Sequence, residues 1–178
     1  MRYLKLLLII KSFVLATTAS ANVMVNDDSN QALYKELIPY YYAAARTGDD
    51  EVITEFLKAG LPIDVKNSKG YTALMIATYH GRSSAVNALI ASGANVCAED
   101  NKGNTALMAA IFKGEFRIAK QLITTDCDTN HQNKAGQTAV MYATLFGRQQ
   151  LKDILIDRGA DVTLEDASGN SAESLASN

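Results

Sequence analysis

The chain has 178 residues, 48% hydrophobic and 20% charged, with a formal net charge of −2. These values are typical of one folded domain and exclude a disordered, collagen-like or low-complexity chain. Because basic residues do not outnumber acidic ones, electrostatic binding to nucleic acid or anionic lipid is not expected. Two cysteines are too few for a disulfide scaffold or a zinc site made of cysteines alone.

Residues 1–21 have the pattern of a secretory signal peptide. Arg2 and Lys5 precede an apolar run, and residues 19–21 form the Ala-Ser-Ala pattern of a cleavage site. Lys11 interrupts the run, which is shorter than the ~18 residues that a membrane-spanning helix usually needs, so cleavage is favoured over a retained anchor. Cleavage would leave 14 basic and 19 acidic residues, a net charge of −5. We expect a periplasmic protein without membrane insertion, and secretion beyond the cell stays open.

The sequence beyond about residue 36 repeats every 33 residues. Four sets of residues recur at this spacing, one of threonines and a serine and three of glycines. They are Thr72, Thr105, Thr138 and Ser171; Gly70, Gly103, Gly136 and Gly169; Gly48, Gly81, Gly114 and Gly147; and Gly60, Gly93 and Gly159. A fixed period of this length predicts a solenoid of stacked units. The expected organisation is a flexible arm over 22–35, an N-terminal cap over 36–67, full units over 68–100, 101–133 and 134–166, and a partial C-terminal cap over 167–178.

Each unit is predicted to form two helices. In the first full unit Gly70 permits a tight turn, and Thr72 can cap a helix from residue 73 to about 80. Gly81 then tolerates the left-handed conformation of a helix end. The second helix of each unit carries an apolar stripe at helical spacing. The four stripes are Val52, Phe56 and Leu57; Val86, Leu89 and Ile90; Ile118, Leu122 and Ile123; and Leu151, Leu155 and Ile156.

The repeated unit has a specific motif. Residues 70–77, 103–110 and 136–143 read GYTALMIA, GNTALMAA and GQTAVMYA, and Gly-Ala-Asn-Val at 93–96 is matched by Gly-Ala-Asp-Val at 159–162. In these segments the chain resembles ankyrin repeats, over roughly residues 36–178. The resemblance implies an all-α solenoid of stacked helix-turn-helix units with β-turn loops between the repeats.

The motif departs from the family pattern in two ways. The family usually has Thr-Pro-Leu-His at the first helix, and its histidine ties turns together by hydrogen bonds. Here Met75, Met108 and Met141 replace that histidine, which exchanges a polar link for apolar packing. In the unit 101–133, Asp126-Cys127-Asp128 replaces the expected Gly-Ala-Asp, so we expect its second helix to end less regularly.

The pairing of the two cysteines is open from the sequence. Cys97 and Cys127 occupy different positions in adjacent units, and an oxidising compartment would permit a bond between them. Stacked units are roughly 10 Å apart, whereas a disulfide needs Cα atoms within about 7 Å. Two separate thiols, with Cys127 packed at the alanine position, are therefore expected, and a disulfide is the alternative.

No arrangement of residues suggests catalysis, a cofactor or a metal. His80 and His131 lie at non-equivalent repeat positions, and each is expected to be a surface histidine. The carboxylate pairs at 99–100 and 165–166 lie in loops, where aspartate favours turns. The glycines are turn residues at repeat spacing rather than a phosphate-binding loop. We therefore expect no catalytic, cofactor-binding or metal-binding residue.

The resemblance implies that a partner protein docks on the concave face made by the loop tips and the first helices. Tyr79, Phe112 and Leu145 form one row there, with Phe146 beside it. Large apolar side chains at exposed positions suggest an interface. The alternative is that they only cover neighbouring helices. The candidate partner-binding residues are Arg46, Tyr71, Tyr79, His80, Asn104, Phe112, Lys113, Gln137, Leu145 and Phe146.

The sequence thus predicts a monomeric, non-enzymatic module that binds another protein. Similarity to periplasmic ankyrin proteins linked to catalase suggests an envelope accessory role related to oxidative stress. Two alternatives are an immunity protein that neutralises a periplasm-acting toxin and a secreted effector that binds a host protein. Fold alone does not identify the partner.

Overall fold

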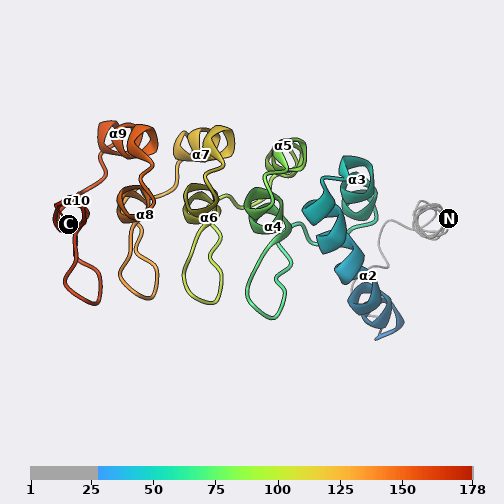
Figure 1. The fold of residues 1–178 in the computed structure, drawn as a ribbon. Coiled ribbons are helices and arrows are strands. Elements are labelled where there is room, and N and C mark those ends of the chain that lie inside the picture. Colours follow the sequence, from blue (N-terminus) through green and yellow to red (C-terminus); the bar gives the residue numbers. More distant parts are fainter. Residues whose placement is uncertain (1–27, 178) are drawn as a thin grey trace.

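The chain folds into a row of helix pairs, and our computed structural model describes residues 28–177 (Figure 1). One layer holds the first helix of each unit: α2 (Asp28–Thr47), α4 (Ala73–Tyr79), α6 (Ala106–Lys113), α8 (Ala139–Leu145) and α10 (Ala172–Ala176). The other layer holds α3 (Asp50–Lys58), α5 (Ser83–Ala91), α7 (Phe116–Ile123) and α9 (Gln149–Asp157). The loops extend beyond the first helices on the side away from the second helices. The expected all-α solenoid is confirmed.

The N-terminal end of the described chain is more helical than expected. Residues 28–35, assigned to a flexible arm, belong to α2. That expectation is wrong because this segment contains strong helix formers such as alanine, leucine and lysine. It also begins with an aspartate, and a negative charge stabilises the N-terminal end of a helix through the helix dipole. Pro39 lies inside α2, where it removes one backbone hydrogen bond without ending the helix. The expected signal peptide lies outside the described residues.

Four of the first helices begin with the same side-chain cap. A threonine or serine oxygen accepts a hydrogen bond from the backbone N–H three residues later, in the pairs Thr72–Met75, Thr105–Met108, Thr138–Met141 and Ser171–Ser174, at 3.3, 3.4, 3.3 and 3.1 Å. Such a cap satisfies one of the free N–H groups at a helix start. The predicted helix over 73–80 is observed as Ala73–Tyr79.

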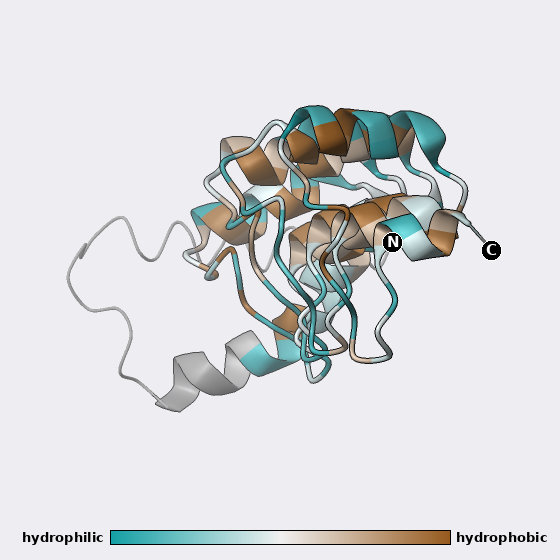
Figure 2. Ribbon diagram, turned by 90° about the vertical axis from the view of Figure 1, so that its left-hand side faces the viewer, coloured by the Kyte–Doolittle hydropathy of each residue, from teal (hydrophilic) through white to brown (hydrophobic). Residues whose placement is uncertain are grey.

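The core lies between the two helix layers. Most stripe residues of the second helices are buried, and Met75, Met108 and Met141 are at most 5% exposed, as the replacement of the family's histidine predicted. Ile156 is 42% exposed, so its assignment to the stripe is wrong. It directly follows buried Leu155, and successive residues on a helix point about 100° apart. In Figure 2 the loops are largely hydrophilic, whereas the helices carry most of the hydrophobic residues.

The loops stack on one another through their backbones. Each loop is closed by a β-turn hydrogen bond, such as that from Gly70 N to Asn67 O at 2.9 Å. The next loop then donates to it, from Asn101 N to Lys69 O at 3.0 Å, and the same contact recurs one and two units later. Gly70 has φ +81°, and a Cβ atom there would lie only 2.5 Å from Asn101 N. The close approach of the loops therefore requires glycine at this position.

Cys97 and Cys127 form a disulfide with a Cα–Cα distance of 5.5 Å. The expectation of two separate thiols is therefore wrong, because it used the spacing of helices, whereas Cys97 lies in a loop that reaches toward the next unit. The residues equivalent to Cys97 in the neighbouring units, Asp64 and Asn130, reach the following unit by hydrogen bonds instead of a disulfide. Asp64 accepts from Asn95 N at 3.0 Å, and Asn130 Oδ1 accepts from Asp161 N at 2.7 Å.

The chain leaves α7 differently from the other second helices, as predicted. In the equivalent units the residue after a positive-φ glycine donates a backbone hydrogen bond back to a carbonyl of the helix. These bonds run from Ala94 N to Leu89 O at 3.0 Å and from Ala160 N to Leu155 O at 2.9 Å. Asp126 stands where that glycine would be, and Thr125 N donates to Leu122 O at 3.2 Å, as Ser92 N and Arg158 N donate to their helices in the equivalent units. The described residues show no return bond from Cys127 N to Leu122 O, however. Cys127 follows this altered helix end directly.

Candidate functional site

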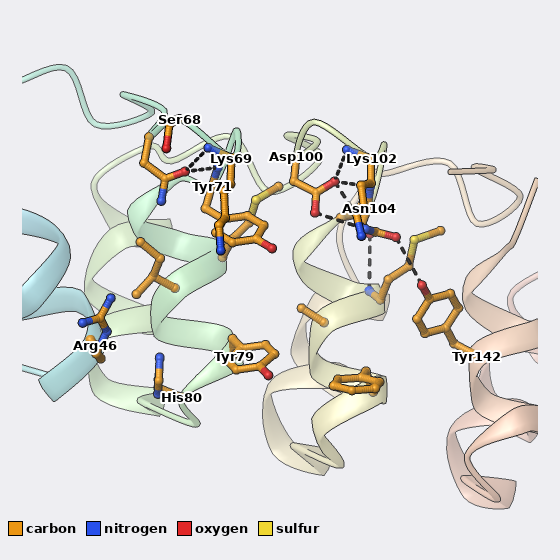
Figure 3. Close-up of a pocket in the computed structure, with 17 residues that line it drawn as sticks. Arg46, Ser68, Lys69, Tyr71, Tyr79, His80, Asp100, Lys102, Asn104 and Tyr142 are labelled. Atoms are coloured by element: carbon orange, nitrogen blue, oxygen red, sulfur yellow. Dashed lines mark hydrogen bonds between the residues drawn. The ribbon is translucent and has the colours of Figure 1, made fainter. Parts of the chain in front are cut away.

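A groove of about 710 Å³ lies on the concave side, between the first helices and the loops that precede them (Figure 3). Side chains of α4 and α6 form its floor, including Met75, Ile76 and Met108. The loops before these two helices form its wall. The groove is therefore built by two consecutive units, and its shape depends on how those units stack.

Three aromatic rings at the ends of the first helices form a continuous surface, which we call the aromatic ridge: Tyr79, Phe112 and Phe146. Tyr79 and Phe112 stack with centroids 6.3 Å apart, and Phe112 meets Phe146 edge to face at 5.0 Å. The rings are nevertheless 43%, 42% and 38% exposed. If these rings served only to cover neighbouring helices, their contacts with one another would be explained, but their exposure to solvent would not.

The wall of the groove is held by side-chain hydrogen bonds between units. Asp100 accepts from Lys102 N at 2.7 Å and from Asn104 N at 2.9 Å, so its carboxylate is turned into its own loop. Asn104 Oδ1 accepts from Tyr142 Oη at 3.2 Å and from Asn133 Nδ2 at 2.8 Å. Burial and the charge of Asp100 raise the pKa of Tyr142, which keeps its hydroxyl protonated and able to donate. These bonds tie two successive loops and α8 together along the groove.

The charges along the groove are mainly positive. In the described part of the chain, Arg46, Lys69 and Lys102 line it, and Asp100 is the acidic residue that does so. His80 lies at the same end as Arg46 in Figure 3. Its pKa is lowered by burial and then by nearby positive charges, the first of them Arg46. The end of the groove near α2 therefore has a positive potential.

The structure brings most of the predicted partner-binding residues together. Six of them line the groove: Arg46, Tyr71, Tyr79, His80, Asn104 and Phe112. Lys113 and Phe146 contact its edge, since Lys113 Nζ lies 4.9 Å from the centroid of the Tyr79 ring. Leu145 is 49% exposed at the end of α8. Gln137 does not line the groove; its Oε1 accepts from Asn133 Nδ2 at 3.2 Å.

His131 is a partly exposed loop residue that also joins two loops. Its Nε2 lies 2.8 Å from Gly103 O, and its Nδ1 lies 3.8 Å from Glu99. Its side chain is 25% exposed. His131 therefore keeps part of its surface in contact with solvent and links its own loop to the loop that contains Gly103.

Sequence reasoning missed several residues of the groove. Asn133 is 7% exposed and joins Asn104 to its own loop, although it reads as an ordinary turn residue. Lys69 and Lys102 precede the turn glycines and read as solvated loop charges. The paired recurrence of lysine one residue before Gly70 and Gly103 is the signal that could have drawn attention to them.

The described side chains, those of residues 35–177, include no cluster of three or more histidine, cysteine, aspartate or glutamate residues that is arranged to hold a metal ion. No helix within residues 28–177 combines the length and the apolar character needed to cross a membrane.

Comparison with known proteins gives the family. A model described as "Ankyrin repeats (3 copies)" matches residues 8–100, 40–133 and 98–166, and the chain belongs to the ankyrin-repeat family. An ankyrin repeat protein of Pseudomonas aeruginosa is 35% identical over 52 residues, which are 29% of this chain and 30% of that protein. The chain thus matches less than a third of that relative's length. Ankyrin repeats are protein–protein interaction modules, so the class of function is the binding of another protein.

Proposed function

We propose that this chain is an exported accessory module of the envelope that binds a partner protein on its concave face. The aromatic ridge carries this proposal, because large apolar side chains fixed by their neighbours and left in contact with solvent are typical of an interface. Each ring is about 40% exposed and already touches the next ring. Little conformational freedom would be lost when a partner packs on such a surface.

The groove beside the ridge supplies the second part of the binding surface. Its floor is apolar and its wall presents backbone and side-chain polar groups of the loops. Because Asp100, Asn104 and Tyr142 fix that wall by hydrogen bonds, the surface is formed before the partner arrives. A protruding or extended segment of the partner therefore fits this site better than a flat surface would.

Two observations support export. Residues 1–21 have the charged start, apolar run and small-residue cleavage pattern of a signal peptide. Cys97 and Cys127 form a disulfide, and such bonds persist in oxidising compartments rather than in the cytosol.

Replacing Tyr79 and Phe112 together by alanine is expected to abolish capture of the partner. Loss of one aromatic anchor of an interface costs roughly 2 kcal/mol or more, so the affinity should fall by a factor of about 30 or more for each. The fold should be retained, because the two side chains are 43% and 42% exposed and belong to the surface rather than to the buried core. Affinity capture from the native cells, with circular dichroism of the purified variant, gives both readouts.

Ile156→Ala provides the matched control for this variant. Ile156 is 42% exposed, as the two aromatic residues are, but it lies on α9 in the other helix layer. It should bind the partner as the unmodified protein does. Unchanged capture by the folded Tyr79→Ala, Phe112→Ala variant would show that the concave face is not the interface.

The export proposal predicts a defined mature form. We expect the protein in the periplasmic fraction, with an intact mass that corresponds to a chain starting at Asn22 and lacking the two thiol hydrogens. Cell fractionation and mass spectrometry under non-reducing conditions test this directly. A full-length chain in the cytosolic fraction, with both cysteines open to alkylation, would contradict it.

A further inference from the structure

We propose that the groove selects an acidic segment of the partner protein, whose carboxylates meet Arg46, Lys69 and Lys102 while an apolar side chain packs on the aromatic ridge. This inference rests on the proposed function and adds the chemistry of the partner. It concerns the half of the concave face between α2 and α6, where the basic residues line one groove together with Tyr79 and Phe112 of the ridge. Figure 3 labels Arg46, Lys69, Lys102 and Tyr79 in this groove.

The distribution of charge within the groove is the first argument. The chain as a whole is acidic, with a net charge of −2, yet basic residues outnumber acidic ones among the described residues that line this groove. Its acidic member, Asp100, accepts hydrogen bonds with both carboxylate oxygens from its own loop. Its carboxylate oxygens therefore already accept hydrogen bonds from their own loop, and it is one negative charge against the three basic residues.

The basic side chains of the groove lack ionic partners within the described chain. Among the described side chains, those of residues 35–177, the ion pairs join Lys58 to Glu55 and His131 to Glu99, and neither involves a groove residue. In addition, Arg82 Nε donates to Arg46 O at 2.9 Å, which brings a second guanidinium group to the same end. A site with three basic residues and one acidic residue, in which no basic side chain forms an ion pair, is complementary to carboxylates.

His80 lies among the positive charges at the α2 end of the groove. Its pKa is lowered by burial and further by Arg46, Arg82 and Lys113, which come from the loop regions and helix ends on both sides of it. An approaching carboxylate would offset these charges and favour the protonated imidazole. A rise in the pKa of His80 would therefore indicate that an acidic ligand occupies the groove.

A protein segment fits these observations better than a nucleic acid does. The negative net charge of the chain repels a long polyanion, and phosphate-backbone binding needs an extended basic surface. The ridge adds an apolar surface directly beside the basic residues, which suits a peptide that carries both carboxylates and a large apolar side chain. The aromatic rings stack mainly on one another rather than standing apart as platforms for successive bases.

Short synthetic peptides in matched sets test the preference. One set alternates Asp and Glu with Phe and Leu, a second replaces the acids by Asn and Gln, a third replaces them by Lys, and a single-stranded oligonucleotide is the fourth probe. Fluorescence anisotropy measures their binding to the oxidised protein at several salt concentrations. We expect the acidic set to bind about tenfold more tightly than the amide set, with an advantage that shrinks as salt screens the charges.

Two charge variants locate the effect. Arg46→Gln, Lys69→Gln, Lys102→Gln should weaken the acidic peptides about tenfold and flatten their salt dependence. Arg117→Gln, Lys120→Gln, Arg158→Gln changes the net charge equally at exposed positions of the other helix layer and should leave binding unchanged. An NMR titration should show the pKa of His80 rising when an acidic peptide binds and staying constant when the amide set is added.

Several outcomes would overturn the acidic preference. Equal binding of the amide or lysine peptides, tighter binding of the oligonucleotide, or no binding of any peptide would each do so. Failure of the proposed function looks different. If the cellular partner is lost by Tyr79→Ala, Phe112→Ala but kept by the groove charge variant, the concave face is the interface and only its acidic preference is wrong.

Discussion

Gly70→Ala is expected to lower the free energy of unfolding by roughly 2–5 kcal/mol. The left-handed backbone at φ +81° costs a non-glycine residue about 1–2 kcal/mol, and the new Cβ atom would also lie 2.5 Å from Asn101 N. The loops must then separate, which costs about 1–3 kcal/mol more, by analogy with overpacked cores. Urea unfolding followed by circular dichroism measures this loss.

Gly169→Ala separates the two causes. Gly169 has φ +77° in the same repeat position, but nothing lies within 4 Å of the Cβ atom that alanine would add. Only the backbone cost of about 1–2 kcal/mol should appear. Equal losses for the two variants would show that the loops do not depend on close stacking, and would contradict the account of the groove wall.

Removal of the disulfide is expected to have the second large effect. Cys97 and Cys127 are separated by 30 residues, and a cross-link over such a loop stabilises a protein by about 3–4 kcal/mol in the chain-entropy model. Cys97→Ser, Cys127→Ser should therefore unfold at clearly lower urea concentration. A reducing agent should shift the unmodified protein in the same way and leave the double variant unaffected.

Asn130→Ala is the matched control for the covalent link. Asn130 occupies the position of Cys97 in the next unit and crosses to Asp161 N by a hydrogen bond of 2.7 Å. Loss of that bond should cost only about 1 kcal/mol. If reduction of the disulfide changed the unfolding midpoint no more than Asn130→Ala does, the bond would not hold the two units together.

Much of the fold follows from the sequence because each unit contacts only its neighbours. Local signals such as the caps at Thr72 and Thr105 and the apolar stripe on α5 therefore decide the structure of a unit, and the 33-residue period places the units in a row. The start of α2 was missed because residues 28–35 lie before the period begins. The disulfide was missed because helix spacing does not describe how far a loop reaches.

The candidate site was predictable only in its apolar part. Tyr79 and Phe112 stand at equivalent ends of first helices, so the repeat register places them side by side. The polar wall depends instead on side-chain contacts between adjacent units, such as Tyr142 with Asn104, which are 38 residues apart in the sequence. Asparagine and lysine in a turn look the same in sequence whether they face solvent or line a groove.

Site-specific photocrosslinking in the native cells tests the central claim most directly. A photoreactive phenylalanine analogue at Phe112 keeps an aromatic ring on the ridge, and the same analogue at Ile156 samples the other helix layer. We expect the Phe112 position to yield one dominant protein adduct, identified by mass spectrometry, and the Ile156 position to yield none. Adducts at Ile156 with none at Phe112 would contradict binding of a partner on the concave face.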